Sequence, residues 1–310
     1  MKVLITGAAG YIGSILVPRL LEEGHEVLGL DNFMYRQTTL LDCCADRRFS
    51  MFRGDARDCT VLDRLVPKAD AIIPLACLTG APLCSRDPVG ATTIILDGAR
   101  EILKRRSKSQ IIIYPTTNSG YGIGEKGKLC TEETPLRPIS LYGRLKADVE
   151  SEILAAGNAI TFRLATVFGV SPRMRTDLLV NDFVLRAVRD RFIVLFEADF
   201  KRNFLHVRDS ADAFLYCLQN FARMKDQPYN VGLSEANLSK RELCDEIRKQ
   251  LPDFYVTESA VGQDPDKRDY IVSNAKIEAA GFKAVRTIQD GIAELLSAYQ
   301  ILPAQPFGNV

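Results

Sequence analysis

Short apolar runs recur along the first half of the chain, and stretches with helical spacing separate them. The runs span residues 2–6, 26–31, 49–53, 70–76, 110–115 and 160–166. Strands that alternate with helices predict an α/β fold with a doubly wound parallel sheet and right-handed crossovers. The run 110–115 is apolar almost throughout, which predicts a central strand buried on both faces.

The pattern changes near residue 166. The chain then enters Gly-, Pro- and Arg-containing loops, regains a strand-like run at 204–207 and ends in helical stretches near 239–250 and 287–301. With 310 residues, of which 46% are apolar, the chain is long enough for two domains. We expect one domain over 1–165 and a smaller lobe over 166–310, with the segment 204–231 returning to the first domain.

The turn after the first strand carries three glycines, Gly7, Gly10 and Gly13, and opens a helix. Glycines at this spacing permit a sharp turn, close approach of a pyrophosphate to the backbone, and tight packing of helix on strand. The phosphates would then lie at the helix N-terminus, which favours anions. This strand, turn and helix predict a Rossmann-like dinucleotide site that includes Tyr11 and Ile12.

The second strand ends in Asp31, followed by Asn32, and both are predicted to bind the cofactor. A carboxylate here accepts hydrogen bonds from the adenosine ribose hydroxyls and repels a 2′-phosphate. The sequence therefore predicts NAD rather than NADP.

A candidate catalytic pair lies on a later helix. Leu141, Leu145 and Val149 form its apolar stripe, so Tyr142 and Lys146 share another face, one turn apart. An ammonium so close favours the phenolate, and we expect it to lower the pKa of Tyr142 towards working pH and make this residue a base. A surface lysine beside a buried tyrosine is the alternative interpretation of the spacing.

A hydroxyl-rich turn, Thr116-Thr117-Asn118-Ser119, follows the central strand at the sheet edge where ligands bind. Together with the glycine turn and the Tyr142 helix, it resembles the extended short-chain dehydrogenase/reductase family of NAD-dependent sugar-nucleotide epimerases and dehydratases. The resemblance covers nearly the whole chain. It implies that Thr117 hydrogen-bonds the sugar hydroxyl while Tyr142 and Lys146 remove its proton, and hydride leaves C4 for NAD.

Other motifs extend the resemblance. It implies that Asp55 holds the adenine amino group beside Ala56, and that Leu75 and Ala76 line the cofactor. It also implies that Arg202, in Arg202-Asn-Phe-Leu-His-Val-Arg-Asp209, contacts the nucleotide diphosphate. Arg268, in Asp264-Pro-Asp-Lys-Arg268-Asp269, is a second candidate, because a guanidinium binds phosphate oxygens bidentately. A solvated charge cluster is the alternative for both.

Departures from the family pattern reduce the number of reactions that the resemblance allows. The 4,6-dehydratases carry an Asp-Glu pair after the catalytic Thr, where this chain has Asn118 and Ser119. Neither can act as a comparable acid or base, so dehydration is disfavoured and both are expected to contact substrate instead. Ile95 and Thr166 stand where the family has asparagines, which predicts a changed cofactor-side contact and a reshaped sugar pocket.

Four segments, 74–84, 117–126, 163–169 and 171–183, resemble bacterial GDP-heptose C4-dehydrogenases of capsule heptose synthesis. This implies oxidation of GDP-glycero-manno-heptose to its 4-keto form, with Arg173, Arg175 and Asn181 near the nucleotide or sugar. Capping and salt-bridging within the loop are the alternative roles for these three. A UDP- or GDP-hexose 4-epimerase is the alternative enzyme, and a non-catalytic NAD-binding scaffold is the alternative of another class.

Composition excludes several partners. The net charge is +1 and no basic stripe is interleaved with aromatics, which disfavours nucleic acid. No leader or long apolar run is apparent, so we expect a cytoplasmic protein without membrane contact. The eight cysteines lack Cys-x-x-Cys spacing and there are two histidines, which disfavours a metal site. The family resemblance implies a homodimer that pairs the helices near 90–106 and at Tyr142.

Overall fold

The computed structural model describes residues 1–259 and 268–302 of the chain. Its largest sheet has seven parallel strands in the order β11-β7-β5-β4-β1-β2-β3. These strands are β1 (Lys2–Thr6), β2 (Glu26–Asp31), β3 (Phe49–Arg53), β4 (Ala71–Pro74), β5 (Ile111–Thr117), β7 (Ala159–Leu164) and β11 (Gln227–Val231). The predicted α/β fold with a doubly wound parallel sheet is confirmed.

Helices cover both faces of this sheet, and alternate side chains of each strand enter different cores. In β1, Val3 and Ile5 belong to one buried cluster and Leu4 to the other. The first cluster includes residues of α1 and α8, and the second includes residues of α2, α5 and α6. The helices up to α6 are α1 (Gly13–Glu22), α2 (Cys59–Leu65), α3 (Ala81–Arg86), α4 (Pro88–Thr92), α5 (Gly98–Arg105) and α6 (Leu141–Ala156).

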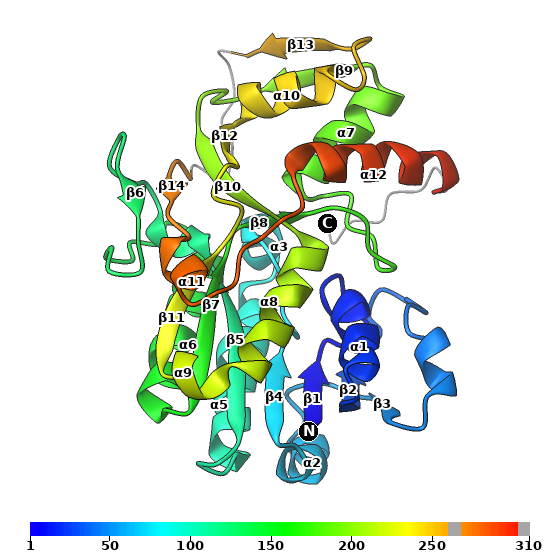
Figure 1. Cartoon of the computed structure of the whole chain (residues 1–310), viewed down its shortest axis with the longest axis vertical. Helices are drawn as coiled ribbons and strands as arrows, with labels where there is room; N and C mark the ends of the chain where they lie inside the picture. Colours follow the sequence, from blue (N-terminus) through cyan, green and yellow to red (C-terminus); the bar gives the residue numbers. More distant parts are fainter. Residues whose placement is uncertain (260–267, 303–310) are drawn as a thin grey trace.

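A second group of elements lies above the carboxyl edge of the sheet, at the top of Figure 1. Its strands form small sheets in the orders β12-β10-β8, β13-β9 and β14-β6. They are β6 (Leu129–Cys130), β8 (Thr166–Phe168), β9 (Phe192–Leu195), β10 (Lys201–His206), β12 (Asn237–Ser239), β13 (Tyr255–Glu258) and β14 (Ile271–Val272). The later helices are α7 (Leu179–Arg189), α8 (Val207–Gln219), α9 (Phe221–Met224), α10 (Lys240–Arg248), α11 (Ala275–Ala279) and α12 (Ile288–Ile301).

The segment predicted to return to the first domain is divided between the two groups. Its first strand, β10, pairs with β8 and β12, whereas β11 pairs with β7 at the edge of the large sheet. Helix α8 connects the two strands. The division of the chain at residue 165 stays a prediction.

The long helix expected over 90–106 is interrupted. A π-helical turn at Thr93–Asp97 separates α4 from α5 and contains the buried Ile95. Such turns widen a helix locally and often lie next to functional sites. Within the described ranges, no helix combines the length and apolar composition that a membrane crossing requires.

Candidate active site

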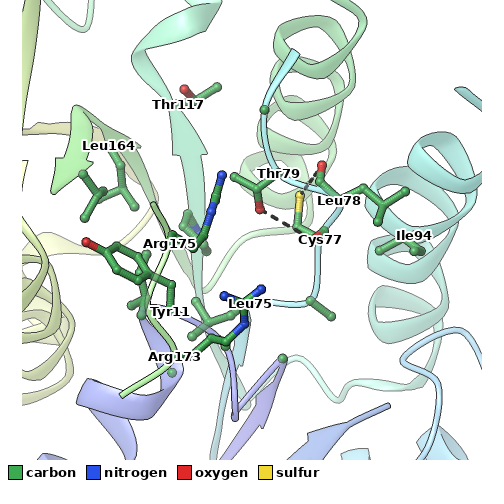
Figure 2. Close-up of a pocket in the computed structure, with 18 of the residues that line it drawn as sticks. Tyr11, Leu75, Cys77, Leu78, Thr79, Ile94, Thr117, Leu164, Arg173 and Arg175 are labelled. Atoms are coloured by element: carbon green, nitrogen blue, oxygen red, sulfur yellow. Dashed lines mark hydrogen bonds between the residues drawn. The ribbon is translucent and has the colours of Figure 1, made fainter. Parts of the chain in front are cut away.

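One cavity of about 270 Å³ lies at the carboxyl edge of the large sheet and extends beneath the second group of elements. Figure 2 shows part of its lining, with Tyr11 and Leu75 towards one end and Thr117 towards the other. Predicted site residues that line it are Gly7, Gly10, Tyr11, Ile12, Gly13, Asp31, Asn32, Asp55, Ala56, Leu75, Ala76, Thr117, Tyr142, Lys146, Arg173, Arg175 and Arg268. The structure therefore brings the predicted cofactor and catalytic residues to one place.

The glycine turn is shaped by close backbone approach. Gly7 has φ +69°, and a Cβ there would lie 2.7 Å from the backbone nitrogen of Ala76. Gly13 begins α1, and a Cβ there would overlap the carbonyl of Ala8. Both positions exclude larger residues, and the turn leaves the N-terminus of α1 open to the cavity, as a bound pyrophosphate requires.

Asp31 lies at the end of β2 and is 7% exposed. Its carboxylate accepts hydrogen bonds from the backbone N–H of Ala9, at 3.0 Å, and of Phe33, at 2.8 Å. Burial raises the pKa of Asp31, and these backbone hydrogen bonds oppose the rise. The carboxylate thus braces the glycine turn while it faces the cavity, a placement that fits a ribose.

The residues predicted to bind adenine have different neighbours. Asp55 forms an ion pair with Arg57 at 2.6 Å, and the hydrogen bonds from Arg57 lower the pKa of this carboxyl. Arg57 also donates to Thr93 Oγ1 at 2.8 Å, which ties Asp55 to the π-helical turn. Asn32 accepts from the backbone N–H of Met34 at 3.0 Å. Asp55 is therefore held in an ionised form at the cavity wall.

The predicted catalytic pair comes from the first turns of α6. Ser140 caps this helix by accepting from the backbone N–H of Gly143 at 3.1 Å. The apolar stripe packs into the sheet, and Tyr142 and Lys146 are buried at the cavity wall. Lys146 Nζ donates to Tyr114 Oη at 3.0 Å and to the carbonyl of Pro115 at 2.8 Å.

The prediction that the pKa of Tyr142 is lowered is wrong for the protein without ligands. Burial raises the pKa of Tyr142, and the opposing effect of the Lys146 ammonium is smaller. For Lys146, burial disfavours the charged form, but Cys77, Tyr114 and Tyr142 outweigh it and the pKa is raised. A charged lysine therefore lies beside a neutral phenol. The prediction failed because the spacing of residues along a helix carries no information about how far burial removes them from water.

Thr117 ends β5 and belongs to a chain of polar contacts. Its Oγ1 lies 2.9 Å from Ser119 Oγ and accepts from the backbone N–H of Ser119 at 3.1 Å. Ser119 Oγ in turn accepts from Arg268 Nη1. Arg268 lines the cavity, so these contacts join one wall of the cavity to the turn after β5. Residues 264–267 of the Arg268 motif lie outside the described residues.

Four predicted substrate residues do not line the cavity. Asn118 and Ser119 are buried in the short 3-10 turn after β5. Arg202 is buried in β10, opposite Leu238 of β12. Asn181 is fully buried in α7, where its amide donates to the carbonyl of Arg175 at 2.8 Å and accepts from the N–H of Gly169 at 3.0 Å. Asn181 therefore fixes the loop that carries Arg173 and Arg175.

Those two arginines have different surroundings. Arg175 pairs with Asp177, and Figure 2 shows its side chain extending in the direction of Thr117. Arg173 stacks on the Tyr35 ring, with its Cζ 4.4 Å from the centroid. Figure 2 shows Arg173 near Leu75 and Tyr11. Only Arg175 therefore extends towards the predicted catalytic residues.

Sequence reasoning missed several lining or supporting residues. Tyr35 and Gln37 line the cavity, and Tyr114 holds Lys146 from β5. Tyr114 lies in the apolar run that predicted the strand β5. Its hydroxyl, the polar group of an otherwise apolar side chain, was the one sequence signal that could have indicated a role at the site. Thr166, noted as a departure, also lines the cavity. The described residues contain no group of three or more His, Cys, Asp and Glu side chains arranged to hold a metal.

Comparison with known proteins identifies the family. The model of the NAD dependent epimerase/dehydratase family matches residues 3–232, well over half of the chain. The chain belongs to this family. It is therefore an NAD-dependent enzyme of the group that acts on sugar nucleotides, and the prediction of NAD as cofactor is confirmed.

Individual relatives are distant. The chain is 26% identical to a UDP-glucose 4-epimerase of Lactobacillus helveticus, over 86% of this chain and 87% of that protein. It is 27% identical to a UDP-glucose 4-epimerase of Streptococcus mutans, over 91% and 92%. Among solved structures, a Bacillus cereus UDP-glucuronic acid 4-epimerase with UDP-glucuronic acid and NAD superposes with a TM-score of 0.86 at 22% identity, over 97% of this chain and all of that one. That structural likeness establishes the fold.

Proposed function

We propose that this enzyme oxidises C4 of a nucleotide-activated sugar and releases the 4-keto product. The observation that carries the proposal is that Thr117, Tyr142 and Lys146 line the same cavity as the glycine turn and Asp31. Removing two hydrogens from a carbinol requires a base for the hydroxyl proton and an acceptor for the hydride. NAD, when bound, supplies the hydride acceptor.

The chain's own residues divide the remaining work. Thr117 Oγ1 orients the sugar hydroxyl. Tyr142 first releases its own proton to solvent and then, as the phenolate, accepts the proton of that hydroxyl. Lys146 is charged and fixed by Tyr114 and the Pro115 carbonyl, and its charge stabilises this phenolate. Arg175, braced by Asp177, and Arg268 provide cations for the nucleotide diphosphate. Dehydration is disfavoured, because neither Asn118 nor Ser119 can act as an acid or base comparable to the Asp-Glu pair of the dehydratases.

For the substrate we propose GDP-glycero-manno-heptose. Support comes from the four segments that resemble GDP-heptose C4-dehydrogenases, because each of them supplies residues to the cavity, among them Leu75, Thr117, Thr166 and Arg173. The similarity to UDP-glucose 4-epimerases of Lactobacillus helveticus and Streptococcus mutans favours a second candidate, a 4-epimerase acting through a transient 4-keto sugar. An epimerase returns the hydride to the opposite face of C4.

The test is to incubate the purified enzyme and NAD with GDP-heptose and with GDP-, UDP-, dTDP- and CDP-hexoses, following absorbance at 340 nm and product mass. A loss of two mass units with lasting NADH on one substrate supports the dehydrogenase and identifies its sugar. An isomer of unchanged mass without lasting NADH identifies the epimerase and contradicts the first proposal. Turnover of UDP-hexoses without turnover of GDP-heptose contradicts the proposed substrate.

A further inference from the structure

The loop after β8 packs directly on the glycine turn. Tyr11 donates its hydroxyl to the carbonyl of Gly169 at 2.6 Å, and Ser171 Oγ donates to the carbonyl of Tyr11 at 2.7 Å. Ser14, in the first turn of α1, has its Oγ 2.9 Å from Ser171 Oγ. These contacts join residues more than 150 positions apart in sequence. The loop is therefore part of the wall around the cofactor turn.

Arg173 projects from this loop at the cofactor end of the cavity. Its backbone N–H donates to Ser14 Oγ at 3.4 Å, and its guanidinium stacks on Tyr35, in the loop that follows β2. The side chain is 6% exposed and lines the cavity. Burial lowers the pKa of Arg173, so an anion in the cavity would offset the cost of keeping this charge.

The other cations that line the cavity have different positions. Lys146 is held by Tyr114 and the Pro115 carbonyl, beside Tyr142. Arg268 donates to Ser119, next to Thr117, and Arg175 extends in the direction of Thr117. Among the described lining residues, Arg173 is the cation anchored to the first turn of α1. That turn carries no acidic side chain, and its N-terminus favours anions.

We infer that Arg173 binds the pyrophosphate of NAD, opposite the glycine turn, and retains the cofactor between turnovers. The loop after β8 thereby serves both ligands, with Arg173 on the cofactor and Arg175 on the nucleotide sugar. Planar guanidinium groups bind phosphate oxygens through paired hydrogen bonds, which a lysine cannot reproduce. This inference depends on NAD dependence and not on which sugar is oxidised.

The experiment measures nucleotide binding without any sugar. Wild type, Arg173→Met, Arg173→Lys and a control, Arg36→Met, are titrated with NAD, ADP and adenosine, for example by displacement of NADH fluorescence. Arg36 is an exposed neighbour of Tyr35 that does not line the cavity. Arg36→Met therefore removes the same positive charge as Arg173→Met without changing the cavity wall. We expect Arg173→Met to weaken NAD and ADP about 10- to 100-fold and leave adenosine unchanged, because only the first two carry a pyrophosphate.

Arg173→Lys should weaken NAD and ADP by a smaller factor, and Arg36→Met should bind all three nucleotides like wild type. Unchanged NAD and ADP affinities in Arg173→Met overturn the inference. An equal loss for adenosine also overturns it, since Arg173 would then act at the adenosine end through Asp31 or Tyr35. If Arg173→Met does not fold, the ADP-to-adenosine ratio of Arg173→Lys decides by the same criterion.

Discussion

The two ends of the cavity are built differently. At the end predicted to hold the cofactor, Gly7, Gly13 and Asp31 come from a single stretch of the chain, and close backbone packing decides the shape. At the end proposed to hold the substrate, Thr117, Arg175 and Arg268 come from widely separated segments and present their side chains to the cavity. Backbone geometry tolerates little change, whereas loop side chains can be exchanged without altering the sheet. One family can therefore keep its cofactor while its sugar varies.

The largest expected effect falls on the residue between the two ends. We expect Tyr142→Phe to lower turnover on the order of a thousandfold while NAD affinity stays within about twofold of wild type, because only the proton acceptor is removed. Tyr255→Phe, at an exposed tyrosine of β13, is the control. Single-turnover kinetics and NAD titration test this. Undiminished turnover in Tyr142→Phe would exclude this residue as the base.

The next effect tests the backbone character of the cofactor end. Gly7→Ala should lower the free energy of unfolding by about 2 to 5 kcal/mol, since it adds a clash with Ala76 to a left-handed φ. Gly24→Ala is a matched control, because Gly24 also has a positive φ, +81°, but a Cβ there would meet only Arg48 Nη1, at an ordinary contact distance of 3.8 Å. It should cost about 1 to 2 kcal/mol. Equal losses in urea denaturation would show that close packing at Gly7 contributes nothing.

A smaller effect should be confined to the substrate end. Asp177→Asn weakens the pairing that holds Arg175, so we expect KM for the nucleotide sugar to rise about tenfold while NAD affinity is unchanged. Asp190→Asn, an exposed carboxylate at the end of α7, is the control. If NAD affinity falls with KM, the two ends of the cavity are coupled rather than independent.

The smallest signal concerns one of the ten tyrosines. Because burial raises the pKa of Tyr142, its phenol should remain protonated as the pH of the free enzyme rises to 10. Subtracting the ultraviolet titration of Tyr142→Phe from that of wild type isolates this group. A phenolate that forms between pH 7 and 9 in the free protein would contradict the effect of burial. It would support the sequence-based prediction that Lys146 alone lowers the pKa of Tyr142 towards working pH.

The sheet was predictable because its signals are local. The apolar runs correspond to β1 to β5 and β7, and the glycine turn and Asp31 lie where the motif predicts. The π-helical interruption at Thr93–Asp97 was not predictable, because the apolar pattern of the helix continues through it. The small strands β6 and β14 have two residues each, too few for a periodic pattern.

The sequence by itself determined the α/β fold, the cofactor and the shared helix face of Tyr142 and Lys146, because each depends on residues close together in the chain. Only the tertiary structure decided that Asn181 supports a loop, that Arg202 lies outside the cavity, and that Arg173 and Arg175 have different surroundings. It also decided the protonation of Tyr142, through burial. Position across the fold and exclusion of water arise when distant segments pack, and neither is encoded in local spacing.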